Sequence, residues 1–278
     1  MLVAAITLGL VAILLAWPVP ALLPGAQWAY RRPTLGLLVW QLVALVGGTS
    51  MIGSLVLLGA STFADDIPDA TNGMWRFVTH NELPEGSSVW SLLALSGALF
   101  LAAHLLLNLL VTVVYAERER ARHAQLITLL SEPMSDRPGT RVIDTPAPVA
   151  YCLPGALKSI TVLTAGLIEL LDEEELRAVV EHERAHVRLR HDIVLIFFTA
   201  WKVSLPWLPT ARNASREVAL LLEMHADDNA LTHVRRGSLA RAITVVAEGG
   251  ALPKRSDLSA AMPESTPKEL RARLLRLA

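Results

Sequence analysis

The sequence has very few cysteines and few charged side chains for its length. Cys152 is the single cysteine among 278 residues, so no disulfide can form within the chain. A lone thiol suits a reducing compartment. Charged residues make up 18% of the chain and apolar residues 53%, a balance that is rich in apolar residues for a soluble enzyme. The composition therefore favours a membrane protein.

The chain also lacks an excess of charge of either sign. Its formal net charge is −1 at pH 7, whereas nucleic-acid-binding domains usually carry a clustered excess of Lys and Arg. Direct binding to nucleic acid is therefore not expected. No internal repeat or low-complexity segment is present in the sequence.

Asp, Glu, Lys and Arg are absent from three apolar stretches, residues 2–23, 35–60 and 89–115. Each is long enough to cross a bilayer, which takes about 20 helical residues. A cleaved signal peptide is the alternative for the first stretch, but its basic residues, Arg31 and Arg32, follow the apolar run instead of preceding it. The sequence therefore predicts at least three spans and a lipid bilayer as a partner.

The charges beside these stretches predict an orientation in the cell membrane. Residues 61–88 are acidic and contain one arginine, whereas arginines follow the third stretch. Because cytoplasmic flanks carry an excess of Lys and Arg, we expect the N-terminus and residues 61–88 outside, and residues 116 onward in the cytoplasm. The charges concerned are Asp65, Asp66, Asp69, Arg76, Glu82, Glu85, Arg118, Arg120 and Arg122.

A His-Glu-x-x-His pattern occupies residues 182–186. His182 and His186 are one helical turn apart on the same face, so both can bind one metal ion. Glu183 lies near enough to reach a water molecule held by that metal. In a chain with eight histidines, the pattern arises by chance in about one case in a hundred. It predicts a zinc site with Glu183 as the catalytic base.

Local signals predict the helix that this pattern needs. Asp172 and Glu175 have the spacing of a capping box, and the acidic residues between them suit the N-terminal end of a helix dipole. Arg188 and Arg190 suit its last turn. The alternative is a charged surface helix that carries two histidines by chance. Apolar residues at helical spacing favour a packed helix: Leu176, Val179, Val180 and Val187.

A catalytic zinc needs a third protein ligand and an open position for water or substrate. Glu223 is the best candidate, in a second helical stretch over residues 215–234. Asp227 lies one turn later on the same face and can accept a hydrogen bond from a ligand histidine. His225 is a rival ligand on another side of that helix. The predicted ligands are His182, His186 and Glu223.

Two short β-rich runs precede the metal-binding helix. Residues 151–153 and 160–163 flank Pro154 and Gly155, which predicts a hairpin or a turn. An edge strand beside a protease cleft can hold an extended peptide by main-chain hydrogen bonds. A purely structural strand pair fits the same residues equally well.

A family resemblance rests on four runs: VAYCLPG at residues 149–155, ITVLTAGL at 160–167, LRAVVEHERAH at 176–186 and EMHAD at 223–227. Together they resemble the integral-membrane zinc metallopeptidases of the gluzincin clan, most closely the BlaR/MecR-type antirepressor family. HtpX-type and CAAX prenyl proteases share most of these motifs. The similarity covers residues 140–235 closely and the spans before them more loosely.

The resemblance implies a mainly α-helical fold, in which multi-pass transmembrane helices precede a gluzincin-type peptidase domain with a small β-sheet. It implies a protein or peptide substrate, such as a cytoplasmic transcriptional repressor. Antibiotic sensors of the family carry a fourth span and a large extracellular penicillin-binding domain. Because this chain ends at Ala278, β-lactam sensing is not expected. In the family, two histidines and a downstream glutamate bind zinc and another glutamate is the base, here His182, His186, Glu223 and Glu183.

Three parts are expected along the chain: a three-span region (1–115), a cytoplasmic helix and Pro-rich linker (116–148), and the zinc peptidase domain (149–278). The apolar segment 193–208 is a difficult case, because a crossing there would separate Glu223 from the two histidines. We expect a helix that packs in the domain and touches the membrane surface. A buried core helix and a re-entrant segment are the alternatives.

Other polar residues have weaker functional interpretations. For His104 and Asn108, on one face of the third apolar stretch, an interhelical hydrogen bond is plainer than a functional site. We interpret His191 as a capping cation after the metal-binding helix, and His233 as a candidate for stabilising an oxyanion. The basic tail, residues 267–277, predicts an amphipathic helix on the domain or on anionic lipid; the resemblance favours the domain.

The predicted function is an integral-membrane zinc-dependent endopeptidase that acts in signalling or regulatory proteolysis. Zinc would activate a water molecule, and Glu183 would take its proton and deliver it to the leaving amine. One alternative is a catalytically silent signalling or zinc-sensing module that retains the metal site. Another is a membrane scaffold in which the motif is accidental. The sequence leaves a homo-oligomer open.

Overall fold

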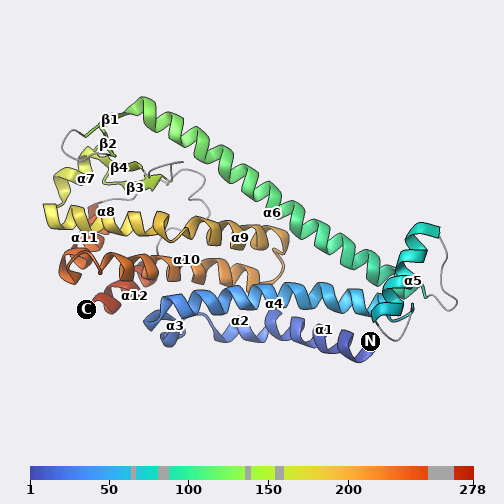
Figure 1. Ribbon diagram of the computed structural model, residues 1–278. Helices are drawn as coiled ribbons and strands as arrows, with labels where there is room; N and C mark the ends of the chain where they lie inside the picture. Colours follow the sequence, from blue (N-terminus) through green and yellow to red (C-terminus); the bar gives the residue numbers. More distant parts are fainter. Residues whose placement is uncertain (64–66, 81–87, 135–138, 154–159, 250–265) are drawn as a thin grey trace. The chain divides into compact units, whose positions relative to one another are not determined.

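A computed structural model describes residues 1–63, 67–80, 88–134, 139–153, 160–249 and 266–278 (Figure 1). Helices dominate these residues, and the strands form one small sheet. The predicted fold class, membrane-span-capable helices followed by a helical domain with a small sheet, is confirmed. The chain divides into two compact units. The first comprises Met1–Pro24, Leu38–Leu110 and Ala200–Ala214, and the second Gly25–Leu37, Val111–Thr199 and Ser215–Ala278.

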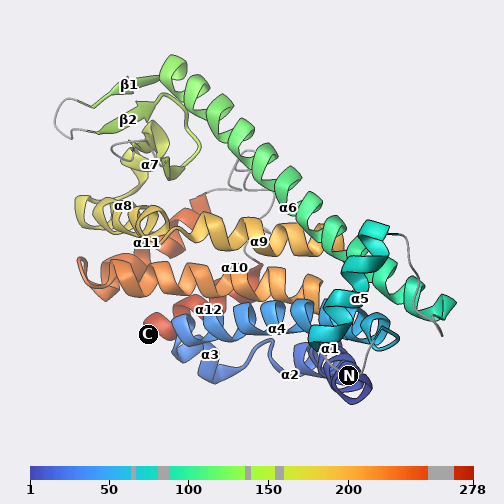
Figure 2. The same ribbon diagram turned by 45° about the vertical axis from the view of Figure 1, so that its right-hand side comes forward.

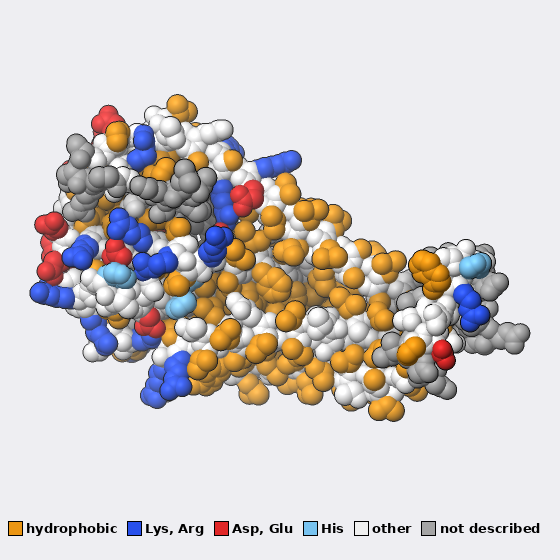
Figure 3. All heavy atoms as spheres, viewed as in Figure 1, with side chains coloured by type: hydrophobic (Ala, Val, Ile, Leu, Met, Phe, Trp, Pro, Cys, Tyr) orange, Lys and Arg blue, Asp and Glu red, His pale blue; other side chains and the backbone are white. Residues whose placement is uncertain are grey.

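The apolar helices predicted from the sequence are present and long enough to cross a membrane. Large apolar side chains such as Leu42 and Leu106 are exposed on them, and Figure 3 shows hydrophobic side chains covering this part of the molecule. Exposed apolar surface of this kind indicates membrane association. The helices are α1 (Leu2–Ala16) with α2 (Pro18–Leu22), α4 (Pro33–Ala60) and α6 (Val89–Leu130).

The segment between α4 and α6 bears on the predicted orientation. It contains α5 (Ile67–His80), which carries Asp69 and Arg76. The number of crossings and the side of the membrane on which each loop lies stay predictions. The remaining acidic residues behind that prediction lie outside the described residues: Asp65, Asp66, Glu82 and Glu85.

The segment 193–208 agrees only in part with our expectation of a helix packed in the domain, because residues 193–199 belong to the second unit and the rest does not. It forms most of α9 (His191–Ser204) and a turn before α10 (Pro209–Ala230), and Ala200–Ala214 groups with the apolar helices instead of the second unit. Two contacts explain this. Thr210 Oγ1 donates to the carbonyl of Leu15 (3.1 Å), and His104 Nε2 lies 3.0 Å from the carbonyl of Ser204. Carbonyls at a helix end need donors from outside the helix.

α9 and α10 are drawn as separate helices in both views (Figures 1 and 2), and the turn between them lies within the first unit. Whether this segment is a buried core helix, a re-entrant segment or a helix at the membrane surface stays a prediction. The interhelical hydrogen bond predicted for His104 is confirmed by its contact with Ser204. Asn108 Nδ2 donates to the carbonyl of His104 (2.8 Å).

The sheet of the second unit has the strand order β1-β2-β4-β3. β3 pairs with β4 in antiparallel fashion, as predicted for a hairpin, and β3 lies at an edge. The turn residues Pro154 and Gly155 lie outside the described residues. The bounds are β1 Ser131–Pro133, β2 Thr140–Ile143, β3 Ala150–Leu153 and β4 Ile160–Thr164. β1 and β2 fall where we expected linker; the domain boundaries stay predictions.

The sheet is held to the helices by a buried apolar cluster. Leu163 of β4 packs with Leu167 of α7 (Ala165–Leu170) and with Leu176 and Val180 of α8 (Glu173–Arg188). Gly166 lies against the Pro146 carbonyl, and a Cβ there would lie 2.0 Å from that oxygen, so no larger residue fits. The cluster fixes the start of α8 against the sheet.

The capping box predicted for α8 is confirmed. The Glu175 amide donates to Asp172 Oδ1 (2.8 Å), and the Asp172 amide donates to Glu175 Oε2 (3.1 Å). The helix ends at Arg188, and Arg190 lies beyond it with a φ of 50°. These signals set the bounds of the helix that carries the His-Glu-x-x-His pattern.

A second buried cluster joins the helices around α8. It contains Ala178 of α8, Ala230 of α10, Leu239 of α11 (Arg236–Gly249) and Leu277 of α12 (Pro267–Leu277). The tail helix predicted for residues 267–277 is therefore present and packs on the domain. The remaining helix, α3 (Gln27–Arg31), follows Gly25, whose amide donates to Glu217 Oε1 of α10 (2.9 Å).

Candidate metal centre

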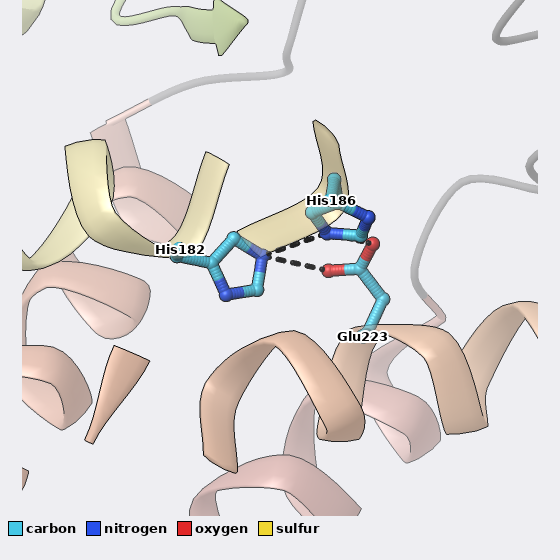
Figure 4. Close-up of side chains that lie close together, drawn as sticks. All are labelled: His182, His186 and Glu223. Carbon is cyan, nitrogen blue, oxygen red and sulfur yellow. Dashed lines mark hydrogen bonds and ion pairs between the residues drawn. The ribbon is translucent and has the colours of Figure 1, made fainter. Parts of the chain in front are cut away.

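Three side chains from two helices converge on one point. Figure 4 shows His182 and His186 extending from α8 toward Glu223 of α10. His182 Nε2 lies 3.2 Å from His186 Nε2 and 3.3 Å from Glu223 Oε2, and His186 Nε2 lies 3.4 Å from Glu223 Oε1. One donor atom from each residue lies within 4.8 Å of the other two. The structure therefore brings together the three residues that the sequence predicted as ligands.

The donor set fits a zinc ion. Imidazole nitrogens and a carboxylate oxygen are common zinc ligands. Glu223 Oε1 is buried and accepts no hydrogen bond in the described structure. A buried carboxylate oxygen without a partner is costly, and a cation would provide that partner. Two imidazole nitrogens that face each other across 3.2 Å can likewise share a cation.

The electrostatic surroundings also favour positive charge here. Burial disfavours the charged form of His182, but contacts with Asp227 and Glu223 outweigh it and raise the His182 pKa to about 9. Burial also opposes ionisation of Glu223, yet Arg273 and the two histidines hold its pKa well below the usual value. The carboxylate is thus available as an anion to bind a metal.

Asp227 lies where the sequence predicted an interaction with a ligand histidine. Its Oδ1 is 2.9 Å from His182 Nδ1, which is ion-pair distance, although the contact lacks the alignment of a regular hydrogen bond. Asp227 is 1% exposed. Burial alone would raise its pKa, but Arg273 and His182 lower it to about 2. A charged Asp227 can orient the His182 ring and hold its Nδ1 proton.

Arg273 is the residue at this site that sequence reasoning missed. It comes from α12, is buried, and donates to Glu223 Oε2 (2.9 Å) and to both carboxylate oxygens of Asp227 (2.9 and 2.7 Å). The sequence predicts a basic amphipathic helix here but gives Arg273 no role at the metal centre. A signal was available, since Arg273 is one helical turn from Leu277 and so lies on the apolar face of the predicted helix.

Glu183 is buried on α8 next to His182. Its negative charge contributes to raising the pKa of the Cys152 thiol on the edge strand β3, after the larger effect of burial. Cys152 Sγ lies 3.3 Å from Thr161 Oγ1 of β4. The role of Glu183 as catalytic base stays a prediction.

Three other histidines were considered from the sequence. His191 is not a capping cation: it is 2% exposed and begins α9, and burial with the neighbouring His186 and His225 lowers its pKa to about 3. His225 does not join the metal-binding cluster, since it faces His191. His233 is exposed and lies 4.0 Å from Glu181 Oε2, away from the cluster.

One family model matches the chain. The model of Peptidase family M48 matches residues 115–251, nearly half of the sequence, and this segment contains His182, His186 and Glu223. No curated protein matches the chain. The match supports membership of the M48 metallopeptidases, and with the His/His/Glu cluster it indicates a metal-dependent peptidase, a hydrolase. The specific likeness to BlaR/MecR-type antirepressors stays a prediction.

Proposed function

We propose, from the match to peptidase family M48 and the geometry of the metal centre, that this protein is an integral-membrane zinc endopeptidase. The convergence of His182, His186 and Glu223 carries the proposal. Their donor atoms lie within 4.8 Å of one another, and Glu223 Oε1 is buried without a hydrogen bond. Zinc bound there would supply a Lewis acid that polarises a peptide carbonyl and acidifies water.

Glu183 is the proposed base. It is buried one residue from His182, and its carboxylate interacts electrostatically with the Arg273 cation. In this role its carboxylate accepts a proton from the attacking water and delivers it to the nitrogen of the leaving amine. Asp227 and Arg273 contact the ligands and not the metal ion: Asp227 orients the His182 ring, and Arg273 holds the Glu223 carboxylate.

The edge strand β3 is the proposed docking element for substrate. Among the described residues β3 has one neighbouring strand, β4, so its other edge can pair with an extended peptide. The Glu183 carboxylate is close enough to Cys152 in β3 to help raise the pKa of that thiol. A peptide paired with β3 would therefore pass beside the catalytic carboxylate.

The membrane association favours substrates at the bilayer surface. In the proposed topology the N-terminus is outside and the catalytic unit is cytoplasmic, and the re-entrant pair α9–α10 returns Glu223 to the same side as the histidines. The substrate would then be a cytoplasmic or membrane-proximal regulatory protein, such as a transcriptional repressor, and cleavage would transmit a signal. The resemblance to antirepressor peptidases supports this choice.

The test uses the full chain purified in detergent. Zinc content and cleavage of an unstructured protein such as casein are measured for wild type, Glu183→Gln and Glu223→Ala, with Glu173→Gln as the control because Glu173 is an exposed carboxylate of the same helix. We expect zinc in wild type, Glu183→Gln and Glu173→Gln, and its loss in Glu223→Ala. Turnover should fall by about 10²–10⁴-fold in Glu183→Gln.

Two results would overturn the proposal. Wild-type protein that takes up no zinc after repletion would remove the metal centre. Full cleavage activity in Glu183→Gln would remove the mechanism, even if zinc is bound. Glu173→Gln removes the same charge from α8 at another position. If it keeps wild-type turnover, the loss in Glu183→Gln is due to the position of that carboxylate and not to the net charge of the helix.

A further inference from the structure

His191 and His225 lie outside the metal centre and form a row of neighbouring imidazoles with the ligand His186. His186 Nδ1 lies 3.0 Å from His191 Nδ1, and His191 Nε2 lies 3.2 Å from His225 Nδ1. The three residues belong to α8, α9 and α10. His186 directs its other nitrogen, Nε2, toward Glu223. The row of imidazoles therefore begins at His186 Nδ1, the ring nitrogen that would not bind the metal ion.

The backbone adopts an unusual conformation at Arg190, between His186 and His191, and this conformation allows the two rings to meet. Arg190 has a φ of 50°, and in the described residues it is the one residue other than glycine in this left-handed region. L-residues adopt it only at a conformational cost. If α8 continued as a regular helix, residue 191 would lie about 140° around the axis from His186. The break after Leu189 instead returns His191 to the His186 ring.

Burial defines the hydrogen-bond direction along the row of imidazoles. His191 is 2% exposed, and burial favours the neutral form of an imidazole. A neutral imidazole has one donor and one acceptor. If His186 Nε2 binds a metal, its proton is on Nδ1 and is donated to His191 Nδ1. The proton of His191 is then on Nε2 and is donated to His225 Nδ1. Every buried nitrogen in this arrangement has a partner.

We propose that His191 and His225 are positioning residues that fix the ring orientation and tautomer of His186 and so strengthen zinc binding. This inference rests on the proposed function, because it concerns the same metal. It adds a requirement that the His-Glu-x-x-His pattern does not contain: the ligand His186 depends on a buried histidine five positions later and on a second one from α10. Partners of this kind typically contribute 10–100-fold to metal affinity.

The test is a zinc affinity measurement on the full chain in detergent, by competition with a chromophoric chelator. His191→Leu removes both hydrogen bonds. His191→Asn keeps an acceptor oxygen near the position of Nδ1, so it retains the bond to His186. His225→Leu removes the outer partner, and His233→Leu is the control, because His233 is exposed and outside the cluster.

We expect zinc affinity to fall by about 10–100-fold in His191→Leu, to fall less in His225→Leu, and to return to within a few fold of wild type in His191→Asn. His233→Leu should bind as wild type. Cobalt-substituted protein gives a second measurement, since the visible absorption bands report the ligand geometry. These bands should change in His191→Leu and be retained in His191→Asn.

Two outcomes would overturn the inference while leaving the proposed function intact. The first is wild-type zinc affinity and an unchanged cobalt spectrum in both His191→Leu and His225→Leu. The second is a loss in His191→Leu that His191→Asn does not restore, because the acceptor would then not be the cause. Failure of the wild-type protein itself to bind zinc would instead count against the proposed function.

Discussion

Arg273 and Asp227 form a two-pronged ion pair between helices that are far apart in the sequence. Arg273 Nε donates to one carboxylate oxygen of Asp227 (2.9 Å) and Nη2 to the other (2.7 Å), while Nη1 donates to Glu223 Oε2. Both partners are buried. The planar guanidinium group matches a carboxylate in a way that a lysine ammonium cannot. One cation from α12 thus neutralises two acidic groups that face the metal centre.

Replacement of Arg273 is expected to destabilise the folded protein. Arg273→Gln leaves the Asp227 and Glu223 carboxylates buried without their cation, which should lower the free energy of unfolding by about 3–5 kcal/mol. Arg273→Lys should recover only part of this. Thermal unfolding in detergent gives the measurement, together with zinc content. Arg271→Gln is the matched control, since Arg271 is exposed on the same helix. Equal unfolding temperatures for Arg273→Gln and Arg271→Gln would show that the ion pair does not stabilise the fold.

Cys152 is expected to react slowly with thiol reagents. Burial raises its pKa to about 11, and the nearby Glu183 adds to this. Because the thiolate is the reactive form and the pKa is raised, only about 0.1% of the thiol is ionised at pH 8. Alkylation by iodoacetamide, followed by mass spectrometry between pH 7 and 9.5, should accelerate about tenfold per pH unit without levelling off. In the denatured chain, the alkylation rate should level off near pH 9. If the rate in the folded protein also levelled off near pH 9, the raised pKa of the Cys152 thiol would be contradicted.

The turn between α9 and α10 is expected to be inaccessible from water on either side of the membrane. Trp207 in this turn is 60% exposed in the structure, and the segment around it packs with apolar helices. In a Cys152→Ser background, Trp207→Cys should resist a membrane-impermeant maleimide in intact cells and in inverted vesicles, and should react with a lipid-soluble one. Arg188→Cys, exposed on α8, is the control for labelling from the cytoplasmic side. Rapid labelling of Trp207→Cys by the impermeant reagent would rule out a re-entrant segment.

Features encoded within one or two helical turns could be predicted from the sequence. The capping box of Asp172 and Glu175 needs only a three-residue spacing, and the pairing of His182 with His186 needs only the helical repeat. The apolar helices followed from their length and lack of charge. Glu223 was found because a zinc site with two histidines requires a third ligand, and a carboxylate with a companion one turn later stood in a helical stretch.

Features that depend on contacts between distant segments could not be predicted in this way. Arg273 acts on a residue 50 positions earlier, and His191 meets His225 34 positions later. No local spacing records either contact. β1 and β2 were expected in a linker because prolines surround them, yet β2 pairs in parallel with β4. The left-handed backbone at Arg190 has no sequence signal either, since glycine would be the usual residue there.

The position of Arg273 also bears on the order in which the protein is completed during synthesis. A ribosome that has just added Glu223 must add 50 more residues before it reaches Arg273. Until then the nascent chain contains both carboxylates but not the cation that pairs with them, so a closed arrangement of α8 and α10 would be energetically unfavourable. Docking of α12 is therefore expected to follow the synthesis of α8 and α10. The metal centre of a nascent chain is therefore expected to close only after α12 has been synthesised.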